Sequence, residues 1–284
     1  MWRIVAHAAH CGAMDSNDRE LLPPSGVQSH MLEIRHLTKR YHARPVVNDV
    51  TFTAPLGEVT GYLGPNGSGK STTVKMVTGL LAPSDGEIFY RGENINRDLV
   101  AYKALVGYVP EEPHLYSYMT GAEYLEMTGQ LRCLPERKLQ EKIGHFLRLL
   151  GLYSDRFSPL SSYSKGMRQK ILISAALLHN PEVIILDEPF SGLDINSTLV
   201  LRRLIQSLAE SGKVVLFSSH ALEVVEKVCS RVVILHNGKV VANDLVTELR
   251  ALMKLPNLEE IFSQLVIEQD TDAVAREFVE AVQS

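Results

Sequence analysis

The segment that decides the fold is Gly64-Pro65-Asn66-Gly67-Ser68-Gly69-Lys70-Ser71. It fits the P-loop pattern, in which a glycine-rich turn is followed by a lysine and a hydroxyl residue. The glycines let successive backbone N–H groups approach a polyphosphate, and a helix that begins near Lys70 adds the positive end of its dipole. We therefore expect Lys70 to reach the β- and γ-phosphates of a nucleotide, Ser71 to bind Mg²⁺, and Thr72 to lie in the same nucleotide-binding segment.

The residues on both sides of this loop supply the context that a P-loop requires. Glu58–Leu63 has the pattern of a strand, and Lys70–Leu81 has the pattern of a helix opened by the turn. This order of strand, loop and helix points the free backbone N–H groups at a phosphate. The sequence therefore predicts a nucleotide-phosphate site rather than a flexible loop that matches the pattern by chance.

A second motif is a pair of carboxylates after the apolar run Val183–Leu186. Such a run is typical of a fully buried strand, and α/β sheets place their ligands at the carboxyl ends of their strands. We expect Asp187 to hold Mg²⁺ directly or through water, and Glu188 to act as the general base that orients the attacking water. A solvated turn or helix cap is the alternative for such a pair taken alone, and the P-loop upstream favours the catalytic interpretation.

Elsewhere, strands alternate with helices, which predicts an α/β core with a parallel sheet. From about Thr120 to Leu178 only helical periodicity is found, and this stretch predicts an inserted helical subdomain at about 112–178. A charge run within it, at 136–142, predicts a solvated helix face. The remaining predicted elements are strands at Met31–Leu37, Val46–Thr53, Glu87–Tyr90, Leu105–Val109, Val214–Ser218, Val232–Leu235 and Val240–Ala242, and helices at Asn196–Ser211, at Leu222–Cys229 and after Pro135.

Composition narrows the class of protein. Of the 284 residues, 29 are basic and 33 acidic, so the formal charge of −4 gives no basic field for nucleic acid, which we do not expect as a partner. Three widely spaced cysteines form neither a disulfide framework nor a metal-ligand spacing. No apolar run approaches the roughly 18 residues of a membrane-spanning helix. We expect a cytoplasmic or peripheral protein.

The two ends of the chain differ from its centre. Residues 1–30 show no periodicity and are rich in polar residues, proline and glycine, so they predict a disordered extension, or a start of synthesis at Met14 or Met31. Residues 245–284 show an amphipathic helical pattern, which predicts an extension that packs on the core or on a partner.

From about Met31 to Asp244 the chain resembles the nucleotide-binding subunit of an ATP-binding-cassette (ABC) transporter, in a single-cassette subgroup similar to multidrug and antibiotic exporters. The resemblance implies a P-loop NTPase core at 31–244 with an N-terminal antiparallel β subdomain. Ser191-Gly192-Leu193-Asp194 resembles the family's D-loop. Ser218-Ser219-His220 resembles its switch region, which would place His220 on the γ-phosphate, and Tyr41 stands where the family stacks an aromatic ring on adenine.

The family's signature loop, Leu-Ser-Gly-Gly-Gln, maps onto Tyr163-Ser164-Lys165-Gly166-Met167. The resemblance implies that Ser164 and Gly166 bind the γ-phosphate of ATP held by the opposite subunit. Lys165 and Met167 depart from the pattern. Glu111 stands where the family usually has glutamine, and its carboxylate could still bind Mg²⁺ or a water.

What the resemblance implies for function is an ATPase subunit, with ATP and Mg²⁺ as its cofactors. It would pair with itself or with a homologous cassette around two ATP molecules. Glu188, His220 and Lys70 would be its catalytic residues. Hydrolysis would power a separate membrane permease, docked near His114–Tyr118, from the cytoplasmic face of the cell membrane, and the subgroup favours export.

Two alternatives remain open. A soluble ABC-type ATPase that acts on ribosomes or DNA typically has two cassettes or a long coiled coil, whereas this sequence has one P-loop and no sustained heptads. An ATP-binding module with little hydrolysis is suggested by Glu111, Lys165 and Met167, but the expected catalytic residues are all present. The sequence does not identify the cargo.

Overall fold

The fold is described from a computed structural model, which covers residues 31–42, 44–112, 114–219, 222–266 and 281. The predicted extension at 1–30, His220, and residues 267–280 and 282–284 of the predicted C-terminal tail lie outside the described residues.

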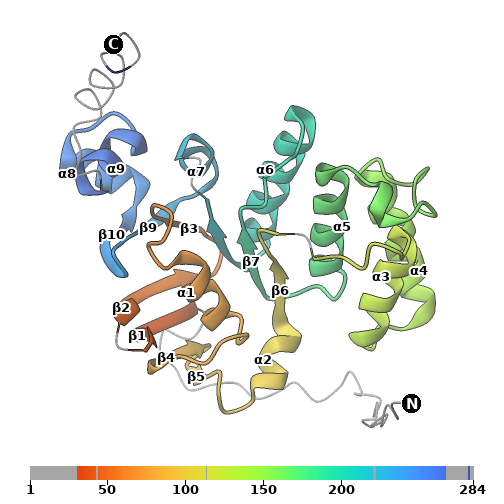
Figure 1. The fold of residues 1–284 in the computed structure, drawn as a ribbon, viewed down its shortest axis with the longest axis horizontal. Helices are drawn as coiled ribbons and strands as arrows, with labels where there is room; N and C mark the ends of the chain where they lie inside the picture. The colour runs from red at the N-terminus through yellow and green to blue at the C-terminus, as the bar shows by residue number, and fades with distance from the viewer. Residues whose placement is uncertain (1–30, 43, 113, 220–221, 267–280, 282–284) are drawn as a thin grey trace.

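A six-stranded sheet forms the centre of the molecule, in the order β10-β9-β3-β8-β7-β6 (Figure 1). All neighbours pair in parallel except β9 and β10, which form an antiparallel hairpin at Asn237-Gly238. Strands β7 and β8 are buried along their whole length, because helices or a second sheet cover both faces. The strands are β3 Val59–Leu63, β6 Val106–Val109, β7 Val183–Asp187, β8 Val214–Ser218, β9 Arg231–His236 and β10 Lys239–Leu245.

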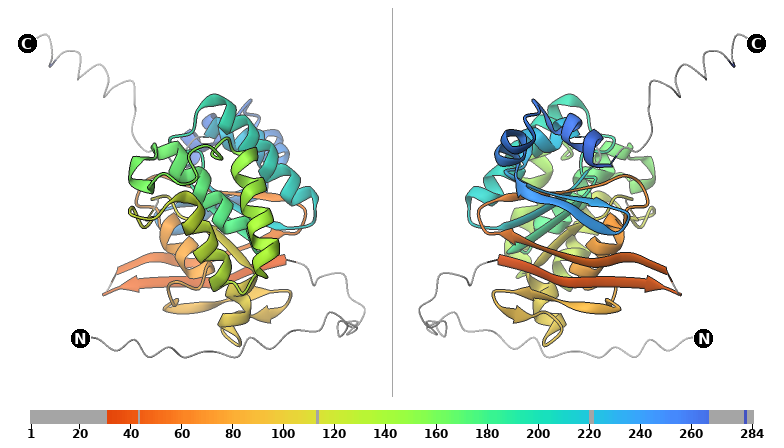
Figure 2. Two further views of the ribbon diagram at one scale, coloured as in Figure 1. Left: turned by 90° about the vertical axis from the view of Figure 1, so that its right-hand side faces the viewer. Right: turned by 90° about the vertical axis from the view of Figure 1, so that its left-hand side faces the viewer.

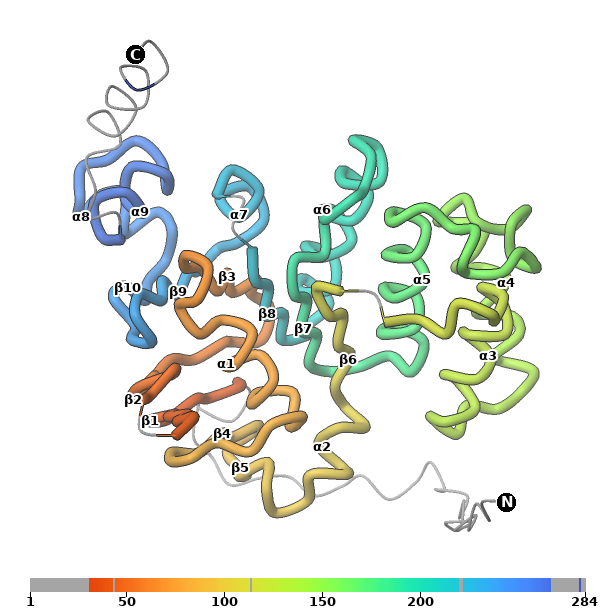
Figure 3. The backbone as a smooth tube through the Cα atoms, in the orientation of Figure 1, coloured from red at the N-terminus to blue at the C-terminus, as the bar shows by residue number. Residues whose placement is uncertain are grey.

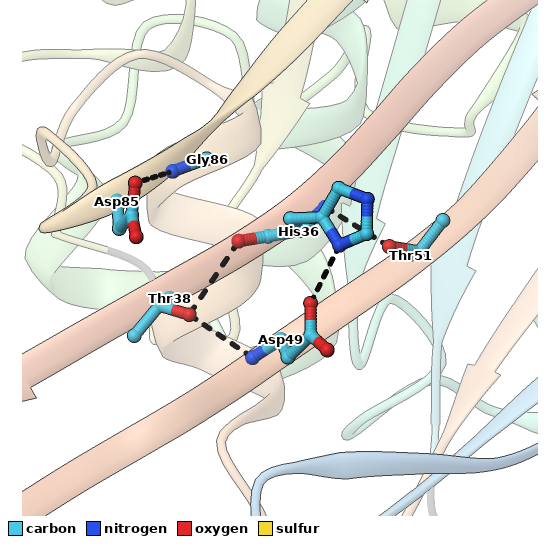
Figure 4. Close-up of polar contacts among 6 residues, drawn as sticks. All are labelled: His36, Thr38, Asp49, Thr51, Asp85 and Gly86. Atoms are coloured by element: carbon cyan, nitrogen blue, oxygen red, sulfur yellow. Dashed lines mark hydrogen bonds and ion pairs between the residues drawn. The ribbon is translucent and has the colours of Figure 1, made fainter.

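A second, antiparallel sheet lies beside the first, in the order β2-β1-β4-β5 (Figure 2). Its strands are β1 Met31–Tyr41, β2 Arg44–Pro55, β4 Asp85–Tyr90 and β5 Glu93–Asn94. The pairing of β1 with β2 shifts register after Ile34, where His36 takes a left-handed φ of 51°. The imidazole Nδ1 of His36 lies 2.7 Å from Asp49 Oδ1, and the Asp49 N–H donates to the Thr38 hydroxyl at 3.0 Å (Figure 4). Such bulges increase strand twist.

Helices fill the space between and around the sheets. Helix α1 (Lys70–Val77) lies between the two sheets, where Val74 and Val77 pack on Val183 and Ile185 of β7. The opposite face of β7, with Ile184 and Leu186, packs in a second apolar cluster. That cluster takes side chains from α5 (Lys165–Leu177), α6 (Ile195–Glu210), α7 (Leu222–Val228), α8 (Val246–Met253) and α9 (Leu258–Val266).

The predicted helical stretch is confirmed as a separate group of helices at one end of the molecule (Figure 1). It contains α3 (Gly121–Leu131), α4 (Glu136–Leu149), a short 3₁₀ turn at Leu160–Ser162, and α5. Its own apolar core includes Leu125, Leu139, Ile143 and Ile171. Helix α3 begins with a capping box, in which Thr120 and Glu123 bond each other's backbone N–H groups.

Three sequence predictions are wrong in detail. Helix α1 ends at Val77 rather than Leu81, because Gly79 has a φ of 71° and the backbone turns there. Helix α2 (Leu99–Leu105), which is capped by Asp98, was not predicted, since seven residues give too little periodicity. The charge run at 136–142 is only partly a solvated face. Arg137 pairs with Glu141, but the Lys142 ammonium turns inward and donates to Leu178 O at 2.9 Å.

Candidate functional site

The P-loop begins where β3 ends and leads into α1, as the sequence predicts. Two of its glycines are required by close contacts. A Cβ on Gly64 would lie 2.4 Å from Leu235 O, and a Cβ on Gly69 would lie 2.7 Å from Val46 O. Gly69, at the N-terminus of α1, also has a φ of 106°, which L side chains rarely adopt. The loop therefore wraps closely around the end of the sheet and leaves the first N–H groups of α1 free for an anion.

A cavity of about 260 Å³ opens at this loop. It brings together the P-loop and the predicted acidic residues. Its lining residues are Val46, Asn66, Gly67, Gly69, Lys70, Ser71, Thr72, Glu111, Asp187 and Glu188. Val46, which comes from β2, was not predicted, because nothing in a strand pattern shows which residue will face a ligand.

The Lys70 ammonium lies against the loop itself, where it donates to Gly64 O at 2.7 Å and to Pro65 O at 3.1 Å. Burial lowers its pKa, and the charges of Glu188, Asp187 and Glu111 act in the opposite direction. The cation is thus held at the base of the cavity, and three carboxylates favour its charged form.

Asp187 ends β7 and is buried, with 4% of its surface exposed. It pairs across the sheet with Ser218, the last residue of β8, whose hydroxyl donates to the Asp187 Oδ1. Burial raises the pKa of this carboxyl, and the hydrogen bond from Ser218 lowers it. Ser218 therefore helps a buried carboxylate to keep its charge. The sequence did not reveal this contact, because it depends on β7 and β8 being neighbours.

Glu188 follows in a left-handed conformation, with a φ of 48°. A non-glycine residue rarely adopts this conformation, and such strain is common at functional sites. Its backbone N–H donates to Ser218 O at 3.1 Å, and its Oε2 accepts a hydrogen bond from the Ser219 hydroxyl at 3.2 Å. The two serines at the end of β8 thus position both carboxylates of the pair.

The oxygen atoms around the cavity suit Mg²⁺. The Ser71 hydroxyl and the carboxylates of Asp187 and Glu111 line the same space. Mg²⁺ is usually held by one or two carboxylates together with substrate phosphates and waters, rather than by a closed protein cage. Ser71, Asp187 and Glu111 are thus the residues that would hold the ion together with the phosphates.

The other predicted loops form a second cluster. Ser164 caps α5, with its hydroxyl accepting from Met167 N at 3.2 Å. Asp194 caps α6: its carboxylate accepts from the Ser197 hydroxyl at 2.6 Å and from Ser197 N at 2.9 Å, and these two bonds lower its pKa. Gly166 lies so close to the loop before α6 that a Cβ on Gly166 would be 2.6 Å from Gly192 O. None of Ser164, Gly166 and Asp194 lines the P-loop cavity.

Tyr41 lies at the end of β1 and is 49% exposed. It is not among the residues that line the cavity, although Val46 on the adjacent strand is. Its ring lies 5.6 Å from the Lys39 ammonium. The predicted role of Tyr41 against adenine therefore stays a prediction, as does the role of His220, which is outside the described residues.

The P-loop at the end of β3, with an acidic pair at the end of β7, defines a P-loop NTPase of the α/β class. Comparison with known proteins identifies the family: residues 47–191 match the profile of the ABC transporter family, and the chain belongs to it. It carries an ABC ATPase domain, as the sequence analysis concluded.

Among curated relatives, an uncharacterized ABC transporter ATP-binding protein of Bacillus subtilis is 40% identical over 74% of this chain and 69% of its own. The bacitracin transport ATP-binding protein of Enterococcus faecalis is 34% identical over 78% of this chain and 72% of its own.

Solved structures give the same fold. The ATP-binding subunit of an ABC transporter, at 34% identity, superposes with a TM-score of 0.78 over 83% of this chain and 99% of that one. A dimeric ATP-binding cassette in a post-hydrolysis state, bound to ADP and phosphate, has a TM-score of 0.70 over 75% of this chain and 98% of that one; at 23% identity it supports the fold alone.

Proposed function

We propose that this protein is the ATP-hydrolysing subunit of an ABC exporter, and that it forms a dimer around two ATP molecules and powers a separate membrane permease. The observation that carries the proposal is a divided site. The P-loop, Asp187 and Glu188 share one cavity, whereas Ser164 and Gly166, which the family pattern assigns to the ATP held by the opposite subunit, lie outside it.

Within one chain, each residue of the cavity has a chemical task. The N–H groups that begin α1 bind the phosphates, and Lys70 moves from the loop carbonyls onto the β- and γ-phosphates. Glu188 accepts the proton of the attacking water, as a carboxylate held by Ser219 in a fixed orientation can do. Mg²⁺, when bound by Ser71, Asp187 and Glu111, supplies positive charge to the phosphate oxygens. We assign His220 to the γ-phosphate and Tyr41 to the adenine on the family pattern alone.

A second cassette completes the site. Ser164 and Gly166 begin α5, so this end of the helix presents N–H groups to an anion. Because these residues do not face their own P-loop, the phosphate they bind comes from a partner, which is either a second copy or a homologous cassette. Asp194, at the start of α6, lies in the loop that contacts this cluster and takes part in the same contact. The solved cassette of the same fold is itself dimeric.

The permease is expected at a groove of about 320 Å³ between β6 and helices α3 and α5, lined by Tyr108, Pro110, His114 and Tyr124 among others. Two exposed aromatic rings lead to it: Tyr116 packs on Tyr118 and on Tyr124, with ring centroids 6.0 and 6.4 Å apart. Exposed aromatic residues beside a groove are typical of partner sites. In the described part of the chain, no helix has the length and apolar character needed to cross a bilayer. Because its family is that of transporter ATP-binding proteins, we place the protein on the cytoplasmic face of the membrane, bound to a separate permease.

The test is extraction of native membranes in mild detergent with a tagged chain, followed by mass spectrometry of the material that co-purifies. We expect a stoichiometric multi-spanning protein. A Tyr118→Glu variant should lose it and keep its ATPase activity, because this side chain is 79% exposed beside the groove. Leu252→Glu, on α8 and 73% exposed, is the matched control and should retain the partner. Recovery only in the soluble fraction, with ribosomal proteins or DNA-bound factors, would overturn the proposal in favour of a soluble ABC ATPase.

A further inference from the structure

A second cavity, of about 490 Å³, lies away from the P-loop between α4, α5 and α6. In Figure 3, α5 runs between the other two helices. Most of its wall is apolar, with Phe146 and Leu149 from α4, Ile173 and Leu177 from α5, and Leu204 from α6. Its volume and lining fall within the range of small-molecule sites.

The cavity is open to the surface, and its edge is apolar as well. Leu149 is 67% exposed and Val200 is 54% exposed. A smaller cavity of about 240 Å³ shares both residues and continues along α6 to Asn196 and Ser197. Exposed apolar side chains around a hollow are unfavourable in water unless a ligand or partner covers them. A ligand that enters here covers apolar surface on three helices.

The polar groups of the larger cavity gather at one end. Lys142 donates to Leu178 O at 2.9 Å, and Lys213 donates to Asn180 Oδ1 at 2.8 Å. Lys213 also donates to Pro181 O, so both ammonium groups are held by one short segment, at 178–181, while the apolar wall extends away from it. A separation of this kind fits a ligand with one charged end and one apolar chain.

The lysine end of the larger cavity is positively charged, and no acidic side chain in the described lining neutralises it. No aspartate or glutamate is among the described residues that line either cavity, and the smaller one adds a third lysine, Lys170. Glu182, whose charge acts on Lys213, accepts a hydrogen bond from Tyr90 and forms an ion pair with Arg91 instead. Burial lowers the pKa of nearby His179, and the charges of Arg132, Lys142 and Lys213 lower it further. Charge complementarity thus selects an anion.

We propose that this cavity is a second binding site, which takes an amphipathic monocarboxylate with a single alkyl chain, a ligand of the fatty-acid class. The carboxylate lies between Lys142 and Lys213, and the chain lies along Phe146, Leu149 and Leu204. The site uses no residue of the P-loop cavity, so the ligand and ATP do not compete for the same residues.

The test is isothermal titration of the full-length protein with sodium dodecanoate below its micellar concentration. We expect saturable binding at one site, with affinity increasing about fourfold for each methylene from octanoate to dodecanoate. Dodecyltrimethylammonium, which has the same chain and the opposite charge, should bind at least tenfold more weakly. Equal binding of the two surfactants, or no saturable binding of dodecanoate, would overturn the proposal.

Four variants locate the binding. Lys142→Gln combined with Lys213→Gln should weaken dodecanoate at least tenfold, because glutamine keeps a hydrogen-bond donor but removes the charge. Lys138→Gln combined with Lys227→Gln removes two exposed lysines and should change nothing. Val200→Trp places a large side chain at the half-exposed mouth and should abolish binding, with circular dichroism checking that the fold is kept. Lys70→Ala should leave dodecanoate binding intact. Unchanged affinity in Val200→Trp would place the ligand elsewhere and reject the site.

Discussion

The Lys165 ammonium donates a hydrogen bond to the Ser191 hydroxyl at 2.6 Å, and this contact joins two loops that are 26 residues apart. The lysine stem also lies against Gly192, where a Cβ would come within 2.9 Å of it. Lys165 replaces a glycine of the family's signature loop, and Ser191 begins the segment that leads to the Asp194 cap. The residue that departs from the family pattern therefore ties the loop before α5 to the loop before α6.

This contact predicts non-additive effects on ATP turnover. Because a hydrogen bond of this kind contributes about 1 kcal/mol, Lys165→Met and Ser191→Ala should each lower kcat/KM about fivefold. The double variant should be no slower than the worse single variant, since both remove one interaction. Lys138→Met, an exposed lysine on α4, should have the wild-type rate. Steady-state kinetics of the four variants measure this, and strictly multiplicative losses would show that the two side chains act independently.

Replacement of Glu188 by glutamine should separate ATP binding from hydrolysis. The amide cannot accept the proton of water, so we expect kcat to fall about 100-fold or more. Binding of a fluorescent ATP analogue should stay within about threefold of wild type, because phosphate contacts carry the affinity.

The control for this prediction is Glu259→Gln, an exposed carboxylate on α9, which should leave turnover unchanged. Equal rates in wild type and Glu188→Gln would remove Glu188 as the base. They would favour the alternative function of an ATP-binding module with little hydrolysis.

Ser218→Ala should shift the pH dependence of activity. The hydroxyl lowers the pKa of Asp187, whereas burial raises it, so the alanine variant has an Asp187 pKa that is higher than in wild type. A larger fraction of the carboxyl is then protonated at a given acidic pH and cannot bind Mg²⁺.

The acidic limb of kcat/KM should therefore move to higher pH in Ser218→Ala, and excess Mg²⁺ should partly restore the rate. Ser207→Ala, on the exposed face of α6, is the matched control. An unchanged acidic limb would show that the bond between Ser218 and Asp187 does not govern the charge of the carboxylate.

Much of the fold could be predicted because its signals are local. The P-loop, the buried run before Asp187 and the hairpin at Asn237-Gly238 each carry their own pattern, and all three were found where expected. Helix α2 was missed, since its seven residues contribute one buried side chain, Tyr102.

The site was predicted less completely, because its geometry depends on which strands are neighbours. Asp187 and Ser218 are 31 residues apart and meet only because β7 and β8 pair. Lys142 belongs to a charged segment that predicts a solvated face, yet its ammonium reaches Leu178 across the helix interface. The hydrophobic pattern within one segment does not predict such contacts between separate helices and strands.

His179 should make the protein less stable in mild acid. Its Nε2 donates to Val106 O at 3.1 Å, and burial, with the charges of Arg132, Lys142 and Lys213, lowers its pKa from 6.5 to about 4. Between these two values the unfolded chain binds the proton and the folded chain does not, so this residue decreases the free energy of unfolding as the pH falls through that range.

The His179→Gln variant keeps a donor for Val106 but has no titrating group. Its urea midpoint should therefore fall less between pH 7 and pH 5 than that of wild type, while exposed His145→Gln should follow the wild type. Parallel curves for wild type and His179→Gln would mean that the imidazole accepts its proton as readily when folded as when unfolded. Dodecanoate gives a second check, because its charge would offset that of Lys142 and Lys213. If it binds between these lysines as proposed, it should raise the pH at which His179 titrates and narrow the difference between the two curves.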